Sequence, residues 1–141
     1  FFFFFYSKRY NREAVNRNSN KINYIEKACN YITRNYSKDL NLDIIADSLS
    51  LNKNYFIKLF KKELSVTPNQ YILSTRLFYA KQMLAQTELS VQNIALSCGF
   101  NTTSYFIKCF REKNENVRVV LYNSNSENSE KIFIEENVTD L

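Results

Sequence analysis

The 141-residue sequence contains no histidine and only one glycine and one proline. Without histidine, the chain cannot form a histidine-based catalytic triad or a zinc site with histidine ligands. Tight β-hairpins and glycine-rich phosphate loops depend on residues that tolerate positive φ, and Gly99 is the only glycine in the chain. The sequence therefore predicts a helical fold without hairpins, and it excludes several classes of enzyme site.

The cysteines and the N-terminal end indicate the compartment. Cys29, Cys98 and Cys109 form no C-x-x-C pair, and each stands among apolar neighbours at helical spacing. Such a set is typical of buried free thiols in a reducing compartment. The run Phe1–Phe5 is far shorter than the roughly 18 residues of a membrane span, and no basic segment precedes it. We expect a cytoplasmic protein without a membrane segment, and we interpret the run as a severed or mistranslated end.

Charge is distributed unevenly along the chain. The net charge is +5, but residues 1–118 hold 18 Lys and Arg against 9 Asp and Glu, whereas residues 119–141 hold one Lys against five acidic residues. The basic excess upstream of the tail suits a polyanionic partner. A solvated surface explains the same charge equally well, so the position of the charges has to decide.

Apolar residues recur at helical spacing in six segments. From Asn20 to Tyr36 they step by three or four residues, which places them on one face of a helix. A helix of about 18 residues, roughly 27 Å long, ends near Gln86. Residues suited to begin the other helices are Asn41, Asn52, Thr67 followed by Pro68, Ser90, and either Thr102 or Thr103.

A two-helix unit occurs twice. Ile45-Ala46 is followed by Tyr55–Lys61 (YFIKLFK), and Ile94-Ala95 is followed by Tyr105–Arg111 (YFIKCFR). The second copy is one residue longer between the two motifs, and we expect its longer turn to use Gly99. A short helix, a turn and a helix with a basic outer face form a helix-turn-helix, whose second helix enters the DNA major groove. A plain helical bundle explains a single copy about as well as DNA binding does, but two matching copies favour DNA binding.

These motifs resemble the DNA-binding domain of the AraC/XylS family of transcription regulators, over about Ile22 to Lys113. The resemblance implies an all-α fold with two helix-turn-helix subdomains joined by a long linker helix. It also implies sequence-specific binding of double-stranded DNA in successive major grooves, with RNA polymerase as a candidate partner and no cofactor. The segments that carry the resemblance are Tyr55–Lys62, Thr67–Ile72, Arg76-Leu77 with Ala80 and Leu84, Ile94–Phe100, and Ser104–Phe106.

The resemblance assigns base reading to exposed positions of the third and sixth helices. Asn is suited to pair with adenine, Lys to donate to guanine, and Ile to contact thymine methyl groups. For Arg76, a structural bond to a carbonyl group and a DNA contact both remain open. The positions assigned to bases are Lys53, Asn54, Ile57, Lys58, Thr103, Ser104, Ile107 and Lys108, and those expected to hold phosphates are Lys61, Lys62 and Arg111.

The C-terminal end of the chain departs from the family pattern. Similar regulators start a closing helix with a Ser/Thr-Pro pair, but this chain has Arg118 in the place of Pro, so the start signal is missing. We hypothesise that the tail is read out of the ancestral frame, and we find no effector-sensing domain in this chain.

The sequence predicts five parts. The expected parts are a linker or remnant at 1–20, a first helix-turn-helix subdomain at 21–66, a linker helix at 67–86, a second subdomain at 87–118, and an acidic, disordered tail at 119–141.

Two rival functions also fit parts of the sequence. Asp39, Asp43 and Asp47 are spaced by four and could bind a metal in an enzyme, but a solvated helix face explains them better, so we expect neither a metal nor enzymatic activity. The other rival is a basic interaction module that binds RNA or protein without sequence specificity. A further alternative is a nonfunctional regulator fragment. Tyr55 and Tyr105 are interpreted as packing residues and not as RNA-stacking residues.

Overall fold

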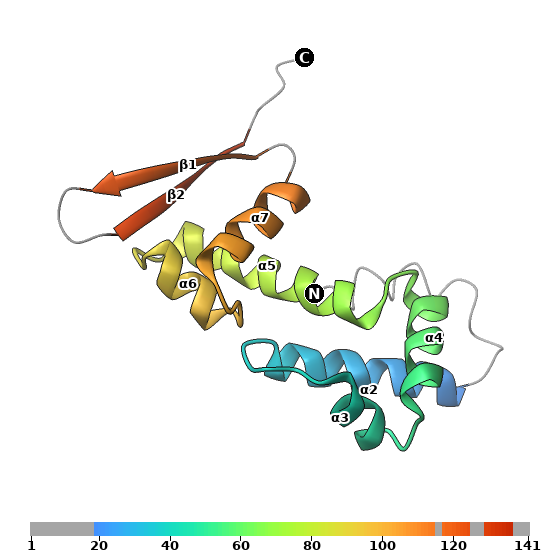
Figure 1. The fold of residues 1–141 in the computed structure, drawn as a ribbon. Helices are drawn as coiled ribbons and strands as arrows, with labels where there is room; N and C mark the ends of the chain where they lie inside the picture. The colour runs from blue at the N-terminus through green and yellow to red at the C-terminus, as the bar shows by residue number, and fades with distance from the viewer. Residues whose placement is uncertain (1–18, 115–116, 125–128, 137–141) are drawn as a thin grey trace, which may run out of the picture. The chain divides into compact units, whose positions relative to one another are not determined.

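The computed structural model describes residues 19–114, 117–124 and 129–136, which Figure 1 shows as a ribbon. The chain forms two compact units, residues 1–75 and residues 76–141, and the boundary between them falls within one long helix. Of the segment predicted to be an N-terminal linker, only the last two residues lie within the described part.

Unit 1 is built from three helices and the beginning of a fourth. These are α2 (Ser19–Asn35), α3 (Leu42–Ser48), α4 (Lys53–Leu64) and the first part of α5 (Pro68–Gln86). The helix α4 lies against both α2 and α3 (Figure 1). One buried apolar cluster joins them, formed by Ile25, Ala28, Cys29, Ile32, Ile45, Ala46, Leu49, Phe56, Leu59, Phe60, Leu64, Tyr71 and Ile72.

Polar residues at the helix starts explain where the helices of unit 1 begin. The side-chain oxygens of Asn41 and Asn52 each accept a hydrogen bond from the backbone N–H two residues ahead, at 2.8 and 2.9 Å. At the start of α5, the N–H of Thr67 donates to Oε1 of Gln70 at 2.9 Å, and the N–H of Gln70 donates to Oγ1 of Thr67 at 3.2 Å. Pro68 follows as the first helical residue, so all three predicted starts are confirmed.

Unit 2 repeats this construction. The helix α6 (Val91–Ser97) begins after Ser90, and α7 (Thr103–Lys113) begins after Thr102, which resolves the choice between Thr102 and Thr103. The helices α6 and α7 pack on each other, and the rings of Phe100 and Phe106 lie 5.0 Å apart. The buried residues of this unit include Leu77, Ala80, Val91, Ile94, Ala95, Cys98, Phe100, Phe106, Cys109 and Phe110.

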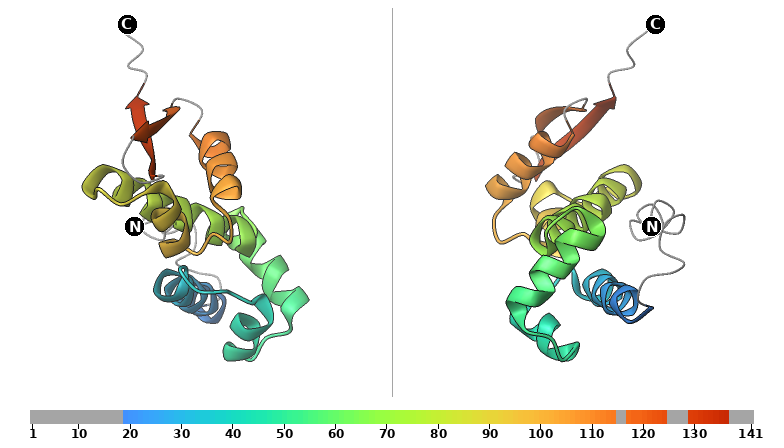
Figure 2. Two further views of the ribbon diagram at one scale, coloured as in Figure 1. Left: turned by 60° about the vertical axis from the view of Figure 1, so that its left-hand side comes forward. Right: turned by 90° about the vertical axis from the view of Figure 1, so that its right-hand side faces the viewer.

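Two strands follow α7 where the sequence analysis expected an acidic, disordered tail. β1 (Val117–Ser124) pairs antiparallel with β2 (Ser129–Glu136), and Figure 2 shows this red pair after the orange α7. The strand β2 runs beside α6. The prediction of disorder is therefore wrong for these residues. Both strands contain runs of β-branched and aromatic residues, which favour strands. The prediction of disorder considered the acidic charge of these residues and not these runs.

The predicted all-α fold with two helix-turn-helix units is confirmed for residues 19–114, which form six helices. Arg118, where the start signal of a closing helix is missing, lies in β1. In the part of the chain that the structure describes, no helix follows α7. Among the described helices, none combines the length and apolar character needed to span a membrane.

Candidate nucleic-acid interface

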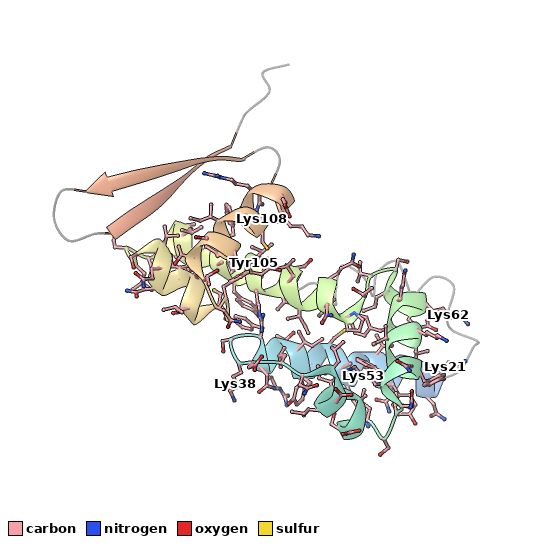
Figure 3. The ribbon with its side chains drawn as sticks, in the orientation of Figure 1. Lys21, Lys38, Lys53, Lys62, Tyr105 and Lys108 are labelled. Carbon is pink, nitrogen blue, oxygen red and sulfur yellow. The ribbon has the colours of Figure 1, made fainter. Side chains whose placement is uncertain are left out.

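The helix α4 turns a polar and basic face to solvent because its opposite face packs in the core of unit 1. Phe56 and Phe60 are fully buried with ring centroids 5.7 Å apart, and the ring of Phe60 lies 5.5 Å from that of Tyr71. These contacts fix the rotation of the helix about its axis. The predicted DNA-contact residues that are exposed on α4 are Lys53, Asn54, Lys58, Lys61 and Lys62, of which Figure 3 labels Lys53 and Lys62.

The helix α7 presents an equivalent face in unit 2. Phe106 and Phe110 are fully buried, with ring centroids 5.6 Å apart. They correspond to Phe56 and Phe60, so each position of α7 stands 50 residues after its equivalent in α4. The predicted contact residues that are exposed on α7 are Ser104, Lys108 and Arg111, and Thr103 is half-buried.

The same hydrogen bond closes the turn in both helix-turn-helix units. The N–H of Leu51 donates to the carbonyl oxygen of Ala46 at 2.9 Å, and the N–H of Phe100 donates to that of Ala95 at 2.9 Å. Both alanines are buried. A small side chain at this position lets the two helices cross closely, as the sequence analysis proposed.

The residue before each of these donors has a positive φ, 55° at Ser50 and 90° at Gly99. The two turns therefore correspond residue by residue as far as Leu51 and Phe100. The additional residue of the second copy is Asn101, which follows the turn. The predicted link between the extra length and Gly99 is therefore wrong, because Ser50 adopts a positive φ at the same place in the shorter copy without being glycine.

Lys53 differs from the other lysines of α4. Its Nζ lies 2.9 Å from Oδ2 of Asp43 in α3, with the two side chains 45% and 55% exposed. The ion pair joins α3 to the first residue of α4 and partly neutralises Lys53. A DNA phosphate would have to compete with Asp43 for this ammonium group, so we expect a smaller contribution from Lys53 than from Lys58.

The two predicted thymine contacts, Ile57 and Ile107, are only half exposed. Ile57 packs against the apolar cluster of unit 1. Both side chains therefore lie at the border between the buried and the outer face of their helix. Only part of each is free to meet a thymine methyl group.

Two tyrosines that the sequence analysis assigned to packing are exposed on these helices. Tyr55 is 46% exposed and Tyr105 is 52% exposed. The rings of Tyr105 and Phe100 lie 6.2 Å apart, so packing accounts for part of Tyr105 only. The spacing in the sequence contained a signal, because each tyrosine stands three residues before an exposed lysine, Lys58 or Lys108, and such residues are neighbours on one helix face.

Electrostatic interactions place Arg76 within unit 2. A hydrogen bond with the Cys109 side chain raises the pKa of Tyr105, and the positive charge of Arg76 acts in the opposite direction. Burial raises the pKa of Cys98 to about 11, again against an opposing effect of Arg76. The half-buried Arg76 thus lies close to both groups.

The three cysteines are free and buried, as expected. Burial raises the pKa of Cys29 to about 12, so this thiol stays protonated at neutral pH. Because the thiolate is the reactive form, the raised pKa values of Cys29 and Cys98 make these two thiols poor nucleophiles.

The acidic residues near α3 do not form a metal site. Within the described ranges, no group of three or more acidic or cysteine side chains could hold a metal ion. Asp43 pairs with Lys53, and Asp39 and Asp47 are exposed. The structure therefore offers no support for the rival interpretation of a metalloenzyme.

Residues 45–115, half of the chain, match a protein-family model described as "Helix-turn-helix domain". The match runs from α3 to just beyond α7 and so includes both helix-turn-helix units. Among curated proteins, the regulatory protein PocR of Salmonella typhimurium is 38% identical over 88 residues, or 62% of this chain. The chain spans only 29% of PocR, 34% of the melibiose operon regulatory protein of Escherichia coli and 21% of the regulator GbdR of Pseudomonas aeruginosa.

Solved structures share the fold. A transcriptional regulator from Chromobacterium violaceum with an AraC-type DNA-binding domain has a TM-score of 0.65 and 30% identity, covering 70% of this chain and 88% of that one. The DNA-binding domain of AdpA, solved in complex with a target DNA, has a TM-score of 0.60 and covers 63% of this chain and 80% of that one. With 18% identity, the likeness to AdpA concerns the fold alone.

Proposed function

Because the chain belongs to the AraC/XylS family of helix-turn-helix transcription regulators, we propose that it binds double-stranded DNA through α4 and α7 and regulates transcription. The observation that carries the proposal is the repeated exposed lysine, Lys58 in α4 and Lys108 in α7. Each lysine lies on a helix whose other face is fixed by two buried phenylalanines. A helix whose rotation about its own axis is fixed in this way presents the same face to a major groove.

The exposed polar residues divide by chemistry into base readers and phosphate binders. Asn54 offers the paired donor and acceptor that match adenine, and Lys58 and Lys108 are donors suited to guanine. Ser104 can donate to or accept from several bases. Ile57, Ile107 and Thr103, which are half-buried, supply apolar contacts at the edge of the outer face.

Phosphate binding is assigned to residues further along each helix. Lys61 and Lys62 in α4 and Arg111 in α7 are exposed in the second half of their helices. Contacts of this kind fix the register of a protein on the duplex, and they make the affinity depend on salt. Lys53 joins this group only when a phosphate displaces Asp43.

We assign the two helices to successive major grooves. The 19 residues of α5 correspond to about 28 Å of helix at 1.5 Å per residue. Successive major grooves on one side of a duplex lie about 34 Å apart, a comparable distance. The AdpA domain, which shares this fold, binds DNA in its solved complex, and this adds support. RNA polymerase is the further partner that we propose for the regulator.

The experiment begins with the 141-residue chain and a pool of random duplexes. Rounds of selection are expected to enrich one sequence, which is then used for titrations at several salt concentrations. Lys58→Ala and Lys108→Ala should each weaken binding to this duplex by about 1–3 kcal/mol if they contact bases, with the fold unchanged. Lys27→Ala, an exposed lysine on α2, is the matched control and should bind as the wild type does.

The rival functions give different results in the same titrations. Equal affinity for duplex DNA, single strands and double-stranded RNA would indicate a basic module without specificity. Unchanged binding in both Lys58→Ala and Lys108→Ala would remove α4 and α7 from the interface, and the proposed function would then be wrong.

A further inference from the structure

Tyr55 and Tyr105 occupy the same place in the two duplicated helices. Each is the third residue of its helix, in the first turn, where recognition helices approach base edges. They are two of the five exposed large hydrophobic side chains in the described part of the chain, and they are the only two of these on α4 or α7. Tyrosine combines an apolar ring with a polar hydroxyl and is enriched at binding surfaces.

The backbone holds both tyrosines in equivalent positions. The N–H of Tyr55 donates to Oδ1 of Asn52 at 3.3 Å, and the N–H of Tyr105 donates to Oγ1 of Thr102 at 3.2 Å. In both copies the tyrosine therefore stands in a capped first turn, beside the exposed lysine three residues ahead. Figure 3 shows Tyr105 and Lys108 together on α7.

The surroundings of the two side chains differ. The Tyr105 side chain forms a hydrogen bond with Cys109, one turn ahead, and its ring packs against Phe100. In the first copy the corresponding residues are Leu59 and Leu51, which have no polar side-chain group and no aromatic ring. The hydroxyl of Tyr105 is thus engaged within the helix, whereas the Tyr55 hydroxyl has no equivalent partner in the described residues.

We propose that both tyrosines contact DNA beside Lys58 and Lys108, Tyr55 by donating its hydroxyl to a backbone phosphate and Tyr105 through its ring alone. The inference rests on the proposed function and assigns it two further contact residues. Tyrosine is among the side chains that bind DNA phosphates, and apolar groups contact thymine methyl groups. In the second copy, Tyr105 then contributes to DNA binding through the shape of its ring. In the first copy, Tyr55 contributes an additional hydrogen bond to the DNA.

An uncharged hydrogen-bond donor has a distinctive effect on how the affinity for DNA depends on salt. A lysine that meets a phosphate releases a counterion, so its removal reduces the slope of log affinity against log salt by about one. A tyrosine hydroxyl carries no charge and releases none. Loss of the Tyr55 hydroxyl should therefore weaken binding at every salt concentration without changing the slope.

The test uses the full chain and the duplex enriched by selection. Tyr55→Phe should weaken binding by more than about tenfold, the range of one hydrogen bond to a charged group, and Tyr105→Phe should leave it unchanged. Tyr105→Ala should weaken binding about tenfold because the ring is lost, and Tyr55→Ala should weaken it more than Tyr55→Phe does because it loses the ring as well as the hydroxyl. Ile44→Ala and Leu96→Ala are the controls, since these exposed apolar side chains lie outside α4 and α7. Thermal melting confirms that each variant is folded.

Every outcome bears on the inference. If both alanine variants bind within twofold of the wild type while Lys58→Ala and Lys108→Ala still weaken binding, the inference is wrong and the proposed function stands. If the lysine variants also bind normally, both are wrong. Equal losses in Tyr55→Phe and Tyr105→Phe would overturn the assigned difference between the two copies, as would a reduced salt slope in Tyr55→Phe.

Discussion

The ammonium group of Lys53 lies 2.9 Å from the carboxylate of Asp43, and this ion pair joins α3 to the start of α4. Both side chains are about half exposed, so the pair adds little to stability. Its larger effect is on the charge that unit 1 offers to DNA. The pair occupies one of the four lysines of α4 and places a negative charge close to the proposed groove-facing surface.

Asp43→Asn is expected to tighten binding to duplex DNA. The substitution removes the carboxylate that competes with phosphate for Lys53, so one more cation becomes available. We expect the slope of log affinity against log salt to steepen by up to about one. Fluorescence titrations of a labelled duplex at several salt concentrations measure both quantities.

Asp47→Asn is the control for this experiment, because it removes the same charge from an exposed position of α3 that has no described ion pair. A general charge effect would tighten binding equally in the two variants. Only a larger change in Asp43→Asn supports a competition for Lys53.

Phe60→Ala is expected to lower the free energy of unfolding by about 3–5 kcal/mol, as for other buried aromatic residues. The Phe60 side chain is fully buried and lies between the rings of Phe56 and Tyr71. Thermal and denaturant unfolding measure the loss. Lys61→Ala, at the exposed neighbouring position, should change stability by less than about 0.5 kcal/mol. An unaltered melting temperature in Phe60→Ala would contradict the described core.

The local features of the helices could be predicted from the sequence. The spacing of Phe56 and Phe60, and of their copies Phe106 and Phe110, follows directly from the helical repeat. Helix starts were equally accessible, because a polar cap satisfies N–H groups within three residues of itself. The predicted membership of the AraC/XylS family is confirmed by the family match.

Features that depend on contacts between elements could not be predicted. Lys53 pairs with a residue of another helix, ten positions away, which helical spacing does not reveal. The positive φ of Ser50 is imposed by the turn and not signalled by residue type. The exposure of Tyr55 and Tyr105 was missed because aromatic residues were equated with packing. The two strands were missed because the acidic charge of residues 119–141 outweighed their β-forming runs.

Ser50→Gly and Gly99→Ala should change stability in opposite directions. Positive φ costs a residue other than glycine roughly 1–2 kcal/mol, and glycine loses part of this advantage through its greater freedom when unfolded. Ser50→Gly should therefore raise the free energy of unfolding by up to about 1 kcal/mol. Gly99→Ala should lower it by about 1–2 kcal/mol, because its φ of 90° lies further from the region that alanine tolerates. Denaturant unfolding measures both, and a loss in Ser50→Gly would contradict the described turn.

Cys29 should make the protein less stable as the pH rises above about 9. The thiol is 1% exposed, and burial raises its pKa from 9.0 to about 12. Between these values the folded chain keeps the proton and the unfolded chain has lost it. The folded state therefore binds more protons, so its stability is fully present below pH 9 and declines as the pH increases. The decline amounts to about 1.4 kcal/mol for each pH unit in this range.

The measurement compares the wild type with Cys29→Ala by denaturant unfolding between about pH 8 and about pH 10. The variant loses some packing at every pH, so the slopes are compared and not the absolute values. Cys98, whose pKa burial raises to about 11, contributes equally to both proteins and cancels. A shallower decline in Cys29→Ala is expected, whereas parallel curves would show that the Cys29 thiol titrates alike in the folded and unfolded states.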